Sequence, residues 1–143
     1  MTTSGRRWLG CLVLCVLAGC GKGDTVFPVE GKVLVDGQPL TVGTVIFTPD
    51  TSKGNSSQAE PRGQLDANGV YRVYMTKDRE GVPPGWYKIS ISAQRLKNAK
   101  DPLSYVSVIP SKYTNPKTSG LVLQVVDNPA PGAYDIKLPT KQP

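Results

Sequence analysis

The sequence predicts an all-β fold, a single antiparallel β-sandwich of about seven strands. From residue 26 onward, apolar residues alternate with polar ones over short runs, which is the pattern of strands with one buried face. No stretch keeps apolar residues at helical spacing for three turns. Turn residues, chiefly Gly, Pro, Asn and Asp, separate the runs at intervals of about 8 to 12 residues, as in sandwich folds.

The first two strands are predicted at residues 29–35 and 44–48. In the first, three valines and a glycine share one face, and the run ends at Asp36-Gly37, a dipeptide suited to a tight turn. In the second, apolar residues alternate with threonines. Pro49 closes this strand, because proline has no amide hydrogen to donate to a sheet.

The middle of the chain is predicted to contain a loop and then a hairpin. Residues 50–60 are small and polar and bury little apolar surface, so a mobile loop is expected there. Residues 62–65 and 70–75 form the hairpin strands. Between them lie residues 66–69, whose Asn and Gly tolerate positive φ.

The clearest strand signal is the alternation of Tyr87, Ile89 and Ile91 with Lys88 and Ser90. We expect the first three side chains to be buried and the other two to be exposed, because successive residues of a strand point to opposite faces.

The last third of the chain begins with an irregular segment. Residues 94–119 contain three prolines and no sustained period, which predicts a long excursion with a short strand at 105–109. Further strands are predicted to start at residues 121–125 and 134–138, where apolar residues alternate again.

A short pattern recurs three times, with a turn glycine, a tyrosine two residues later and an apolar residue two residues after that. We expect each tyrosine to pack on the core and its hydroxyl to bond nearby backbone, as in the tyrosine corner of sandwich folds. The alternative is an aromatic platform for a ligand. The pairs are Gly69 and Tyr71, Gly85 and Tyr87, and Gly132 and Tyr134.

The N-terminal residues have the form of a bacterial export signal. Arg6 and Arg7 precede an apolar run that ends at Leu17, and small residues follow, as in a cleaved leader. The segment Leu17-Ala18-Gly19-Cys20 resembles the lipobox of bacterial lipoproteins. That resemblance implies that Cys20 is acylated and becomes the first residue of the mature chain. An ordinary cleaved signal and an uncleaved membrane anchor are the alternatives.

This resemblance predicts four segments: a lipoprotein signal peptide at 1–19, a lipidated tether at 20–26, the sandwich at 27–139 and a C-terminal tail at 140–143. Cys11 and Cys15 leave with the signal peptide, so the mature chain keeps only Cys20 and has no intramolecular disulfide. The domain is then held to the membrane through the lipid on Cys20. By resemblance to proteobacterial lipoproteins, Gly21 after the cysteine favours the outer membrane.

The distribution of charge along the chain argues against one class of partner, nucleic acid. The chain carries a formal net charge of +6, but its cations are scattered and form no basic stripe interleaved with aromatic residues. Nucleic acid is therefore not expected as a partner. An envelope protein or a polysaccharide is the partner expected of an exported domain besides the membrane itself.

Five segments within residues 27–93 resemble the carboxypeptidase regulatory-like (transthyretin-like) domain family. The resemblance implies a sandwich that accompanies other envelope functions as a non-catalytic binding or structural module. The segments are Val29–Val33, Asp36–Leu40, Gly43–Phe47, Asp66–Tyr71 and Pro84–Ile89.

The chain has no histidine, which excludes Ser-His-Asp and Cys-His catalysis and histidine-based zinc sites. Transthyretin-like hydrolases of purine breakdown products depend on histidines, so their activity is not carried over. No enzyme activity, cofactor or metal is expected; Lys77 stands where a calcium loop beginning at Asp66 would need its closing Glu. A carboxylate hydrolase is the third interpretation, with candidate acids Asp36, Asp50, Asp66, Asp78, Glu80, Asp101 and Asp127.

Trp86 is the candidate ligand contact. By strand alternation it points away from the face of Tyr87, so an exposed indole could stack on sugar or contact a partner. This is the basis of the second interpretation, a carbohydrate-binding surface lipoprotein. The opposing expectation is that the excursion at residues 94–119 folds over Trp86 and covers it.

Overall fold

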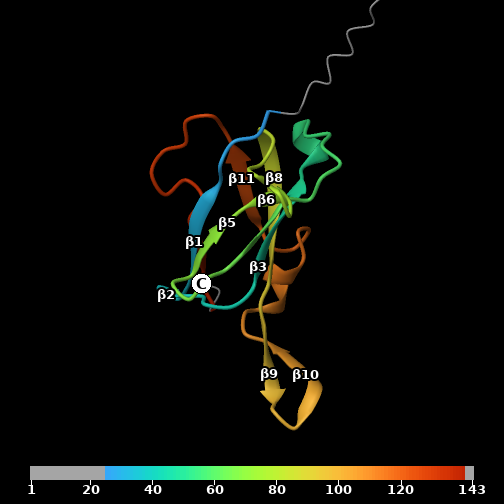
Figure 1. Ribbon diagram of the computed structural model, residues 1–143, viewed down its shortest axis with the longest axis vertical. Helices are drawn as coiled ribbons and strands as arrows, with labels where there is room; N and C mark the ends of the chain where they lie inside the picture. The colour runs from blue at the N-terminus through green and yellow to red at the C-terminus, as the bar shows by residue number, and fades with distance from the viewer. Residues whose placement is uncertain (1–24, 141–143) are drawn as a thin grey trace, which may run out of the picture.

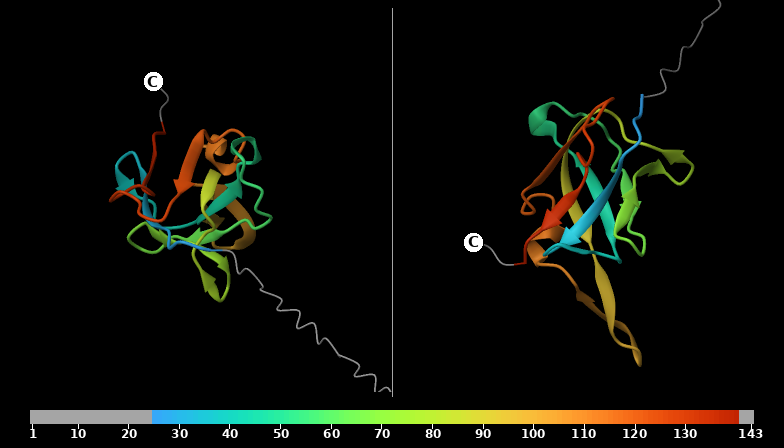
Figure 2. Two further views of the ribbon diagram at one scale, coloured as in Figure 1. Left: turned by 90° about the horizontal axis from the view of Figure 1, so that it is seen from above. Right: turned by 90° about the vertical axis from the view of Figure 1, so that its left-hand side faces the viewer.

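The computed structural model describes residues 25–140, and its architecture is all-β, as the sequence predicts (Figure 1). Within these residues the chain forms strands and two short 3-10 helices, with no α-helix. Two sheets pack face to face as a sandwich, and a hairpin projects from one end (Figure 2). The predicted signal peptide at 1–19 and the acylation site Cys20 lie outside the described residues.

The larger sheet has six strands and is built around β8, its longest strand. One edge of β8 pairs antiparallel with β3, from Thr44 opposite Ser92 to Pro49 opposite Tyr87, and its other edge pairs antiparallel with β11. In sheet order the strands are β11 (Leu121–Val125), β8 (Gly85–Ser92), β3 (Thr44–Pro49), β4 (Arg62–Gln64), β6 (Tyr74–Thr76) and β7 (Arg79–Glu80).

The second sheet is centred on β1 (Glu30–Val35). A tight turn leads from β1 into its antiparallel neighbour β2 (Gln38–Pro39), and Asp36 and Gly37 both have positive φ, which confirms the predicted Asp-Gly turn. The other neighbours of β1 are β5 (Val70–Arg72), which is antiparallel, and β12 (Ile136–Leu138), which is parallel. The first and last strands of the sandwich are therefore side by side.

The core between the sheets is aromatic and β-branched. The ring of Phe47 lies 5.7 Å from that of Tyr87 and 6.3 Å from that of Tyr71. Tyr87, Ile89 and Ile91 are fully buried, as their alternation predicts. This packing of large side chains supplies the main apolar contribution to stability.

The prediction for the opposite face of β8 is only half right. Lys88 is partly exposed, but Ser90 is buried, with 3% of its surface accessible. The reason is that the segment after the projecting hairpin returns to β8: the 3-10 helix η2 (Ser111–Thr114) contacts this strand, and the Ser119 hydroxyl donates a hydrogen bond to the Ile89 carbonyl. This part of the outer face is therefore also covered.

All three tyrosines of the recurrent pattern are buried, which confirms that they belong to the core and rules out an aromatic platform built from them. The Tyr71 hydroxyl donates to the Tyr134 carbonyl over 2.6 Å, and the Tyr87 hydroxyl donates to the Pro83 carbonyl over 3.0 Å. The Tyr134 hydroxyl accepts a hydrogen bond from the Val126 amide. Burial raises the pKa of Tyr71 and of Tyr87, so both remain neutral hydrogen-bond donors.

The segment at residues 50–60 has more structure than its composition predicts. It begins with the 3-10 helix η1 (Thr51–Lys53), whose amide at Ser52 donates to the Asp50 carboxylate. Asp50 and Asn55 are both buried. Hydrogen bonds from Ser52 and the nearby Lys88 ammonium lower the pKa of Asp50, so the carboxylate stays charged. Local polar contacts therefore order a segment that buries little apolar surface.

The excursion at residues 94–119 is mostly a hairpin, which the sequence prediction missed. Its strands are β9 (Gln94–Asn98) and β10 (Asp101–Ser107), so the short strand predicted at 105–109 overlaps only the end of β10. The chain leaves β8 at Ser92 and continues directly into β9, and Val108 returns to donate a hydrogen bond to the Ala93 carbonyl. The hairpin is thus a continuation of β8 beyond the sandwich (Figures 1 and 2).

Candidate binding surfaces

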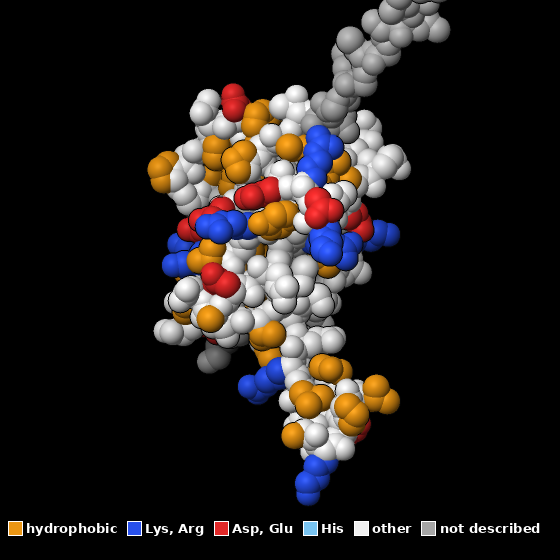
Figure 3. Space-filling view, in the orientation of Figure 1, with side chains coloured by type: hydrophobic (Ala, Val, Ile, Leu, Met, Phe, Trp, Pro, Cys, Tyr) orange, Lys and Arg blue, Asp and Glu red, His pale blue; other side chains and the backbone are white. Residues whose placement is uncertain are grey.

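The β9–β10 hairpin carries the three most exposed of the large apolar side chains in the described residues. Tyr105 lies directly opposite Leu96, so the two side chains share one face of the hairpin. Tyr105 is 59% exposed, Leu96 is 41% exposed, and Leu103 near the tip is 87% exposed. Figure 3 shows these apolar side chains gathered on the projecting hairpin. We call Leu96, Leu103 and Tyr105 the hairpin face.

Cations border the hairpin face. Arg95 and Lys97 alternate with Leu96 along β9, which places their side chains on the opposite side of the hairpin. Lys100 lies at the turn, next to Asp101. Val106 lies directly opposite Arg95, so the side with Arg95 and Lys97 is basic but not free of apolar residues, and the hairpin is amphipathic only in part.

Side-chain hydrogen bonds build the tip of the hairpin. The Ser104 hydroxyl donates to the Asp101 carbonyl, and the amide of Leu103 donates to the Asp101 carboxylate over 3.1 Å. Across the turn, the Lys100 amide donates to the Asn98 side chain over 3.0 Å. These contacts give the tip a defined shape although it has no core of its own.

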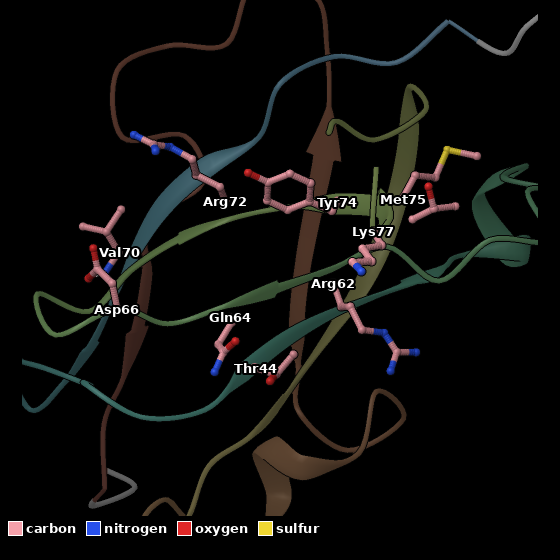
Figure 4. A pocket seen from close by; sticks show the side chains of 10 residues that line it. Thr44, Arg62, Gln64, Asp66, Val70, Arg72, Tyr74, Met75 and Lys77 are labelled. Atoms are coloured by element: carbon pink, nitrogen blue, oxygen red, sulfur yellow. The ribbon is translucent and has the colours of Figure 1, made fainter. Parts of the chain in front are cut away.

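A second surface is an open groove of about 740 Å³ on the outer side of the strands that follow β3 (Figure 4). Gly63 and Tyr71 point into the core, so their strand neighbours point outward. The groove is lined by Thr44, Arg62, Gln64, Asp66, Val70, Arg72, Tyr74, Met75, Thr76 and Lys77.

The groove forms where the chain passes from one sheet to the other. β5 pairs with β1 of the smaller sheet, whereas β6, only one residue further on, pairs with β4 of the larger sheet. To make this passage, β5 runs close over β4. A Cβ at Gly63 would lie 2.6 Å from the Arg72 carbonyl oxygen, so only glycine fits there.

Some charged side chains of the groove have hydrogen-bond or ion-pair partners, and others do not. Arg72 forms an ion pair with Glu30, and this carboxylate raises the pKa of the guanidinium. The Asp66 carboxylate accepts hydrogen bonds from the amides of Val70 and Asn68, which lower its pKa and hold it in the turn. The side chains of Arg62 and Lys77, by contrast, have no hydrogen-bond or ion-pair partner within residues 25–140.

Trp86 is partly exposed, and a cation from η1 lies over its ring. The Lys53 ammonium is 3.8 Å from the centroid of the indole ring. The Asn55 side chain also donates to the Trp86 carbonyl over 2.9 Å. A neighbouring cavity of about 750 Å³ is lined by loop residues from 53 to 59 and 83 to 85, and Trp86 does not line it.

The described carboxylates do not gather in a cavity. Asp66 is the one acid lining the groove, and Asp36 is the one acid lining a smaller cavity of about 480 Å³ near the end of β12. Asp36 accepts a hydrogen bond from the Thr140 amide over 3.0 Å. Asp36, Asp50 and Asp66 thus support turns and chain ends. Across residues 25–140 there is also no group of three His, Cys, Asp or Glu side chains that could hold a metal.

Two features of these surfaces were missed from the sequence. The hairpin face was missed because residues 94–119 were interpreted as irregular, although Arg95 and Lys97 do alternate with Leu96. Tyr74 was missed because its pairing with Arg62 comes from another strand. The register places Arg62 directly opposite it, which local sequence does not reveal.

Comparisons with protein-family models, with curated proteins and with solved structures find no match to this chain. Within the described residues, no helix is long and apolar enough to cross a membrane. The fold itself defines the class of the protein: an all-β sandwich with a projecting hairpin.

Proposed function

We propose that the protein is a lipid-anchored, non-catalytic binding module of the bacterial cell envelope, and that a partner protein docks on its hairpin face. The observation that carries the proposal is the exposure of Leu103, Tyr105 and Leu96 on an element that projects from the sandwich. A hairpin that serves only to connect two strands has no need of this surface.

Energetics supports docking at the hairpin face. Burying a side chain such as Leu103 or Tyr105 contributes about 1.5 to 3 kcal/mol, and aromatic residues dominate the energy of many protein interfaces. An isolated two-stranded hairpin is marginally stable in water. A partner that covers the hairpin face would stabilise both the complex and the hairpin.

The N-terminal end of the described residues lies where a membrane anchor could hold the sandwich. Thr25, the first described residue, lies at the end of the sandwich opposite the hairpin (Figures 1 and 2). Five residues of chain from Cys20 to Thr25 span at most about 18 Å. A lipid on Cys20 would hold that end near the membrane and direct the hairpin face away from it.

The non-catalytic part of the proposal rests on the side chains that the chain has. The sequence has no histidine, and the described cavities each have one lining carboxylate or none. This arrangement disfavours the carboxylate hydrolase, which needs two acids about 5 to 10 Å apart. Sugar binding through Trp86 is disfavoured because Lys53 lies over its ring. The resemblance to carboxypeptidase regulatory-like domains is in line with a binding role.

We expect Cys20→Ala to release the protein from the membrane fraction or to leave it unprocessed. The physical reason is that the acyl chains on Cys20 are the proposed source of membrane affinity. Intact mass spectrometry of the membrane-extracted protein checks this, with a start at Cys20 and added acyl mass as the expected result. Cys15→Ala is the matched control and is expected to change neither mass nor fractionation. An unmodified mature start elsewhere would contradict the anchor.

The docking role is tested by cross-linking the acylated, full-length protein in envelope membranes of the bacterium that makes it. A photoreactive benzophenone side chain in place of Leu103 is expected to give one defined protein adduct. The same side chain in place of Val122, which is exposed on β11, is the control. Adding Tyr105→Ser to the first variant should reduce the adduct at least tenfold. Equal adducts at both positions, or none at residue 103, would contradict docking at the hairpin face.

A further inference from the structure

We propose that the groove lined by Arg62 and Tyr74 is a second binding site, and that it takes a glycan segment bearing carboxylate groups. This site is separate from the hairpin face and from Trp86. The proposal rests on an exposed aromatic ring, uncompensated cations and neutral hydrogen-bonding groups that the fold brings to one surface (Figure 4).

Tyr74 supplies a ring face. It is 38% exposed, whereas the tyrosines of the recurrent pattern are buried in the core. Its ring packs against no other aromatic ring among the described residues. An exposed phenol with one apolar face and one polar end can stack on the C–H surface of a sugar and still bond to its hydroxyls.

Arg62 supplies a charge at the same groove. Its backbone lies directly opposite that of Tyr74 across β4 and β6, and its guanidinium points away from the Tyr74 ring, so the ring and the charge occupy separate places along the groove (Figure 4). The side chain of Arg62 has no hydrogen-bond or ion-pair partner within the described residues, and neither has that of Lys77 at the same groove. A guanidinium recognises a carboxylate through two parallel hydrogen bonds, which makes a uronate-type sugar a better match than a neutral one.

Gln64 and Thr44 supply neutral hydrogen-bonding groups. They are direct cross-strand partners on β4 and β3, and their side chains lie near one another in Figure 4. An amide and a hydroxyl both donate and accept hydrogen bonds, as sugar hydroxyls do. The Asp66 carboxylate, the one acid of the groove, is held in its turn by two backbone amides.

The shape of the groove fits a short chain segment. Its volume of about 740 Å³ is within the range of small-ligand sites, and it lies open along the sheet surface. The close crossing of β5 over β4 at Gly63 leaves no room for a larger residue and holds the wall of the groove in place. Less ordering is then needed on binding, which favours affinity.

The test is isothermal titration of the mature chain carrying Cys20→Ser with tetragalacturonate, and with maltotetraose as the uncharged probe. We expect tetragalacturonate to bind at least tenfold more tightly than maltotetraose. Arg62→Ala, Tyr74→Ala and Gln64→Ala should each weaken tetragalacturonate binding, the first two by at least tenfold. Gln64→Ala leaves the charge unchanged, so it separates hydrogen bonding from net charge.

Lys97→Ala and Tyr105→Ala are the matched controls, because they remove the same kinds of side chain from the hairpin. Both are expected to bind tetragalacturonate like the parent chain. The proposal is overturned if neither glycan binds, if maltotetraose binds equally well, or if Lys97→Ala weakens binding as much as Arg62→Ala. These outcomes leave cross-linking at residue 103 unaffected, so failure of this site is distinguishable from failure of the hairpin proposal.

Discussion

Gly31→Ala is expected to lower the free energy of unfolding by about 2 to 6 kcal/mol, from overpacking and a lost buried hydrogen bond together. A Cβ at Gly31 would lie 2.2 Å from the Tyr134 carbonyl oxygen and 3.0 Å from the Tyr71 hydroxyl. The strand must then move away from Tyr134. That movement breaks the hydrogen bond that the Tyr71 hydroxyl donates to the same carbonyl.

Urea unfolding of a chain that begins at residue 20 measures this effect through Trp86 fluorescence, because the only other tryptophan of the sequence is Trp8. Gly120→Ala is the control for backbone strain. It has positive φ, but no atom lies within 4 Å of the place that the added methyl group would occupy, so a loss of only about 1 to 2 kcal/mol is expected. If Gly31→Ala lowers the free energy of unfolding by no more than Gly120→Ala does, the result contradicts the close approach of β1 to Tyr134.

Tyr71→Phe separates the two contributions to the Gly31→Ala effect. It removes only the hydroxyl and leaves the packing of the ring in place. We expect a loss of about 1 to 3 kcal/mol, because the buried Tyr134 carbonyl loses its side-chain donor. A near-neutral result would show that steric overlap at Gly31 accounts for the whole effect of Gly31→Ala.

Ile89→Ala is expected to lower the free energy of unfolding by about 2 to 5 kcal/mol. Ile89 is fully buried at the centre of β8, opposite Phe47 on one side and Leu121 on the other. Shortening its side chain leaves a cavity between these strands, and the surrounding core relaxes only in part. Because small domains are stable by about 5 to 15 kcal/mol, this is a large share of the total.

Val122→Ala is the control for Ile89→Ala, and the same urea titration applies. Val122 lies on the adjacent strand β11, opposite Lys88, but it is exposed. Its truncation is expected to change stability by less than about 0.5 kcal/mol, as at most surface positions. Similar effects of the two substitutions would contradict the assignment of the sandwich core.

The elements that could be predicted from the sequence are those that lie against the core. Alternation in β8 arises because one face meets the core, and this identified Tyr87, Ile89 and Ile91 correctly. The β9–β10 hairpin lies off the core, so burial imposes no such alternation on it, and it was missed. The burial of Ser90 was missed for a related reason, since the cover comes from residues far along the chain.

The candidate sites also differ in whether their signal lies in neighbouring residues of the sequence or arises only from the fold. Cys20 lies outside the described residues and stays a prediction, made from a signal contained in four consecutive residues. The groove could not be identified, because Arg62 and Tyr74 become neighbours only through strand pairing. Trp86 was correctly placed off the Tyr87 face, but local sequence does not show that Lys53 lies over its ring.

The pairing of β1 with β12 has a consequence for when the protein can fold. The Lys32 amide donates to the Asp135 carboxylate across 103 residues of sequence, and the parallel pairing of the two strands begins beside this bond. Contacts between such distant residues form slowly, because a long loop must close first. Until its last strand is available, the emerging chain has β1 without this neighbour. The second sheet is therefore complete only when β12 has been synthesised, so the sandwich closes as one unit after most of its chain is present.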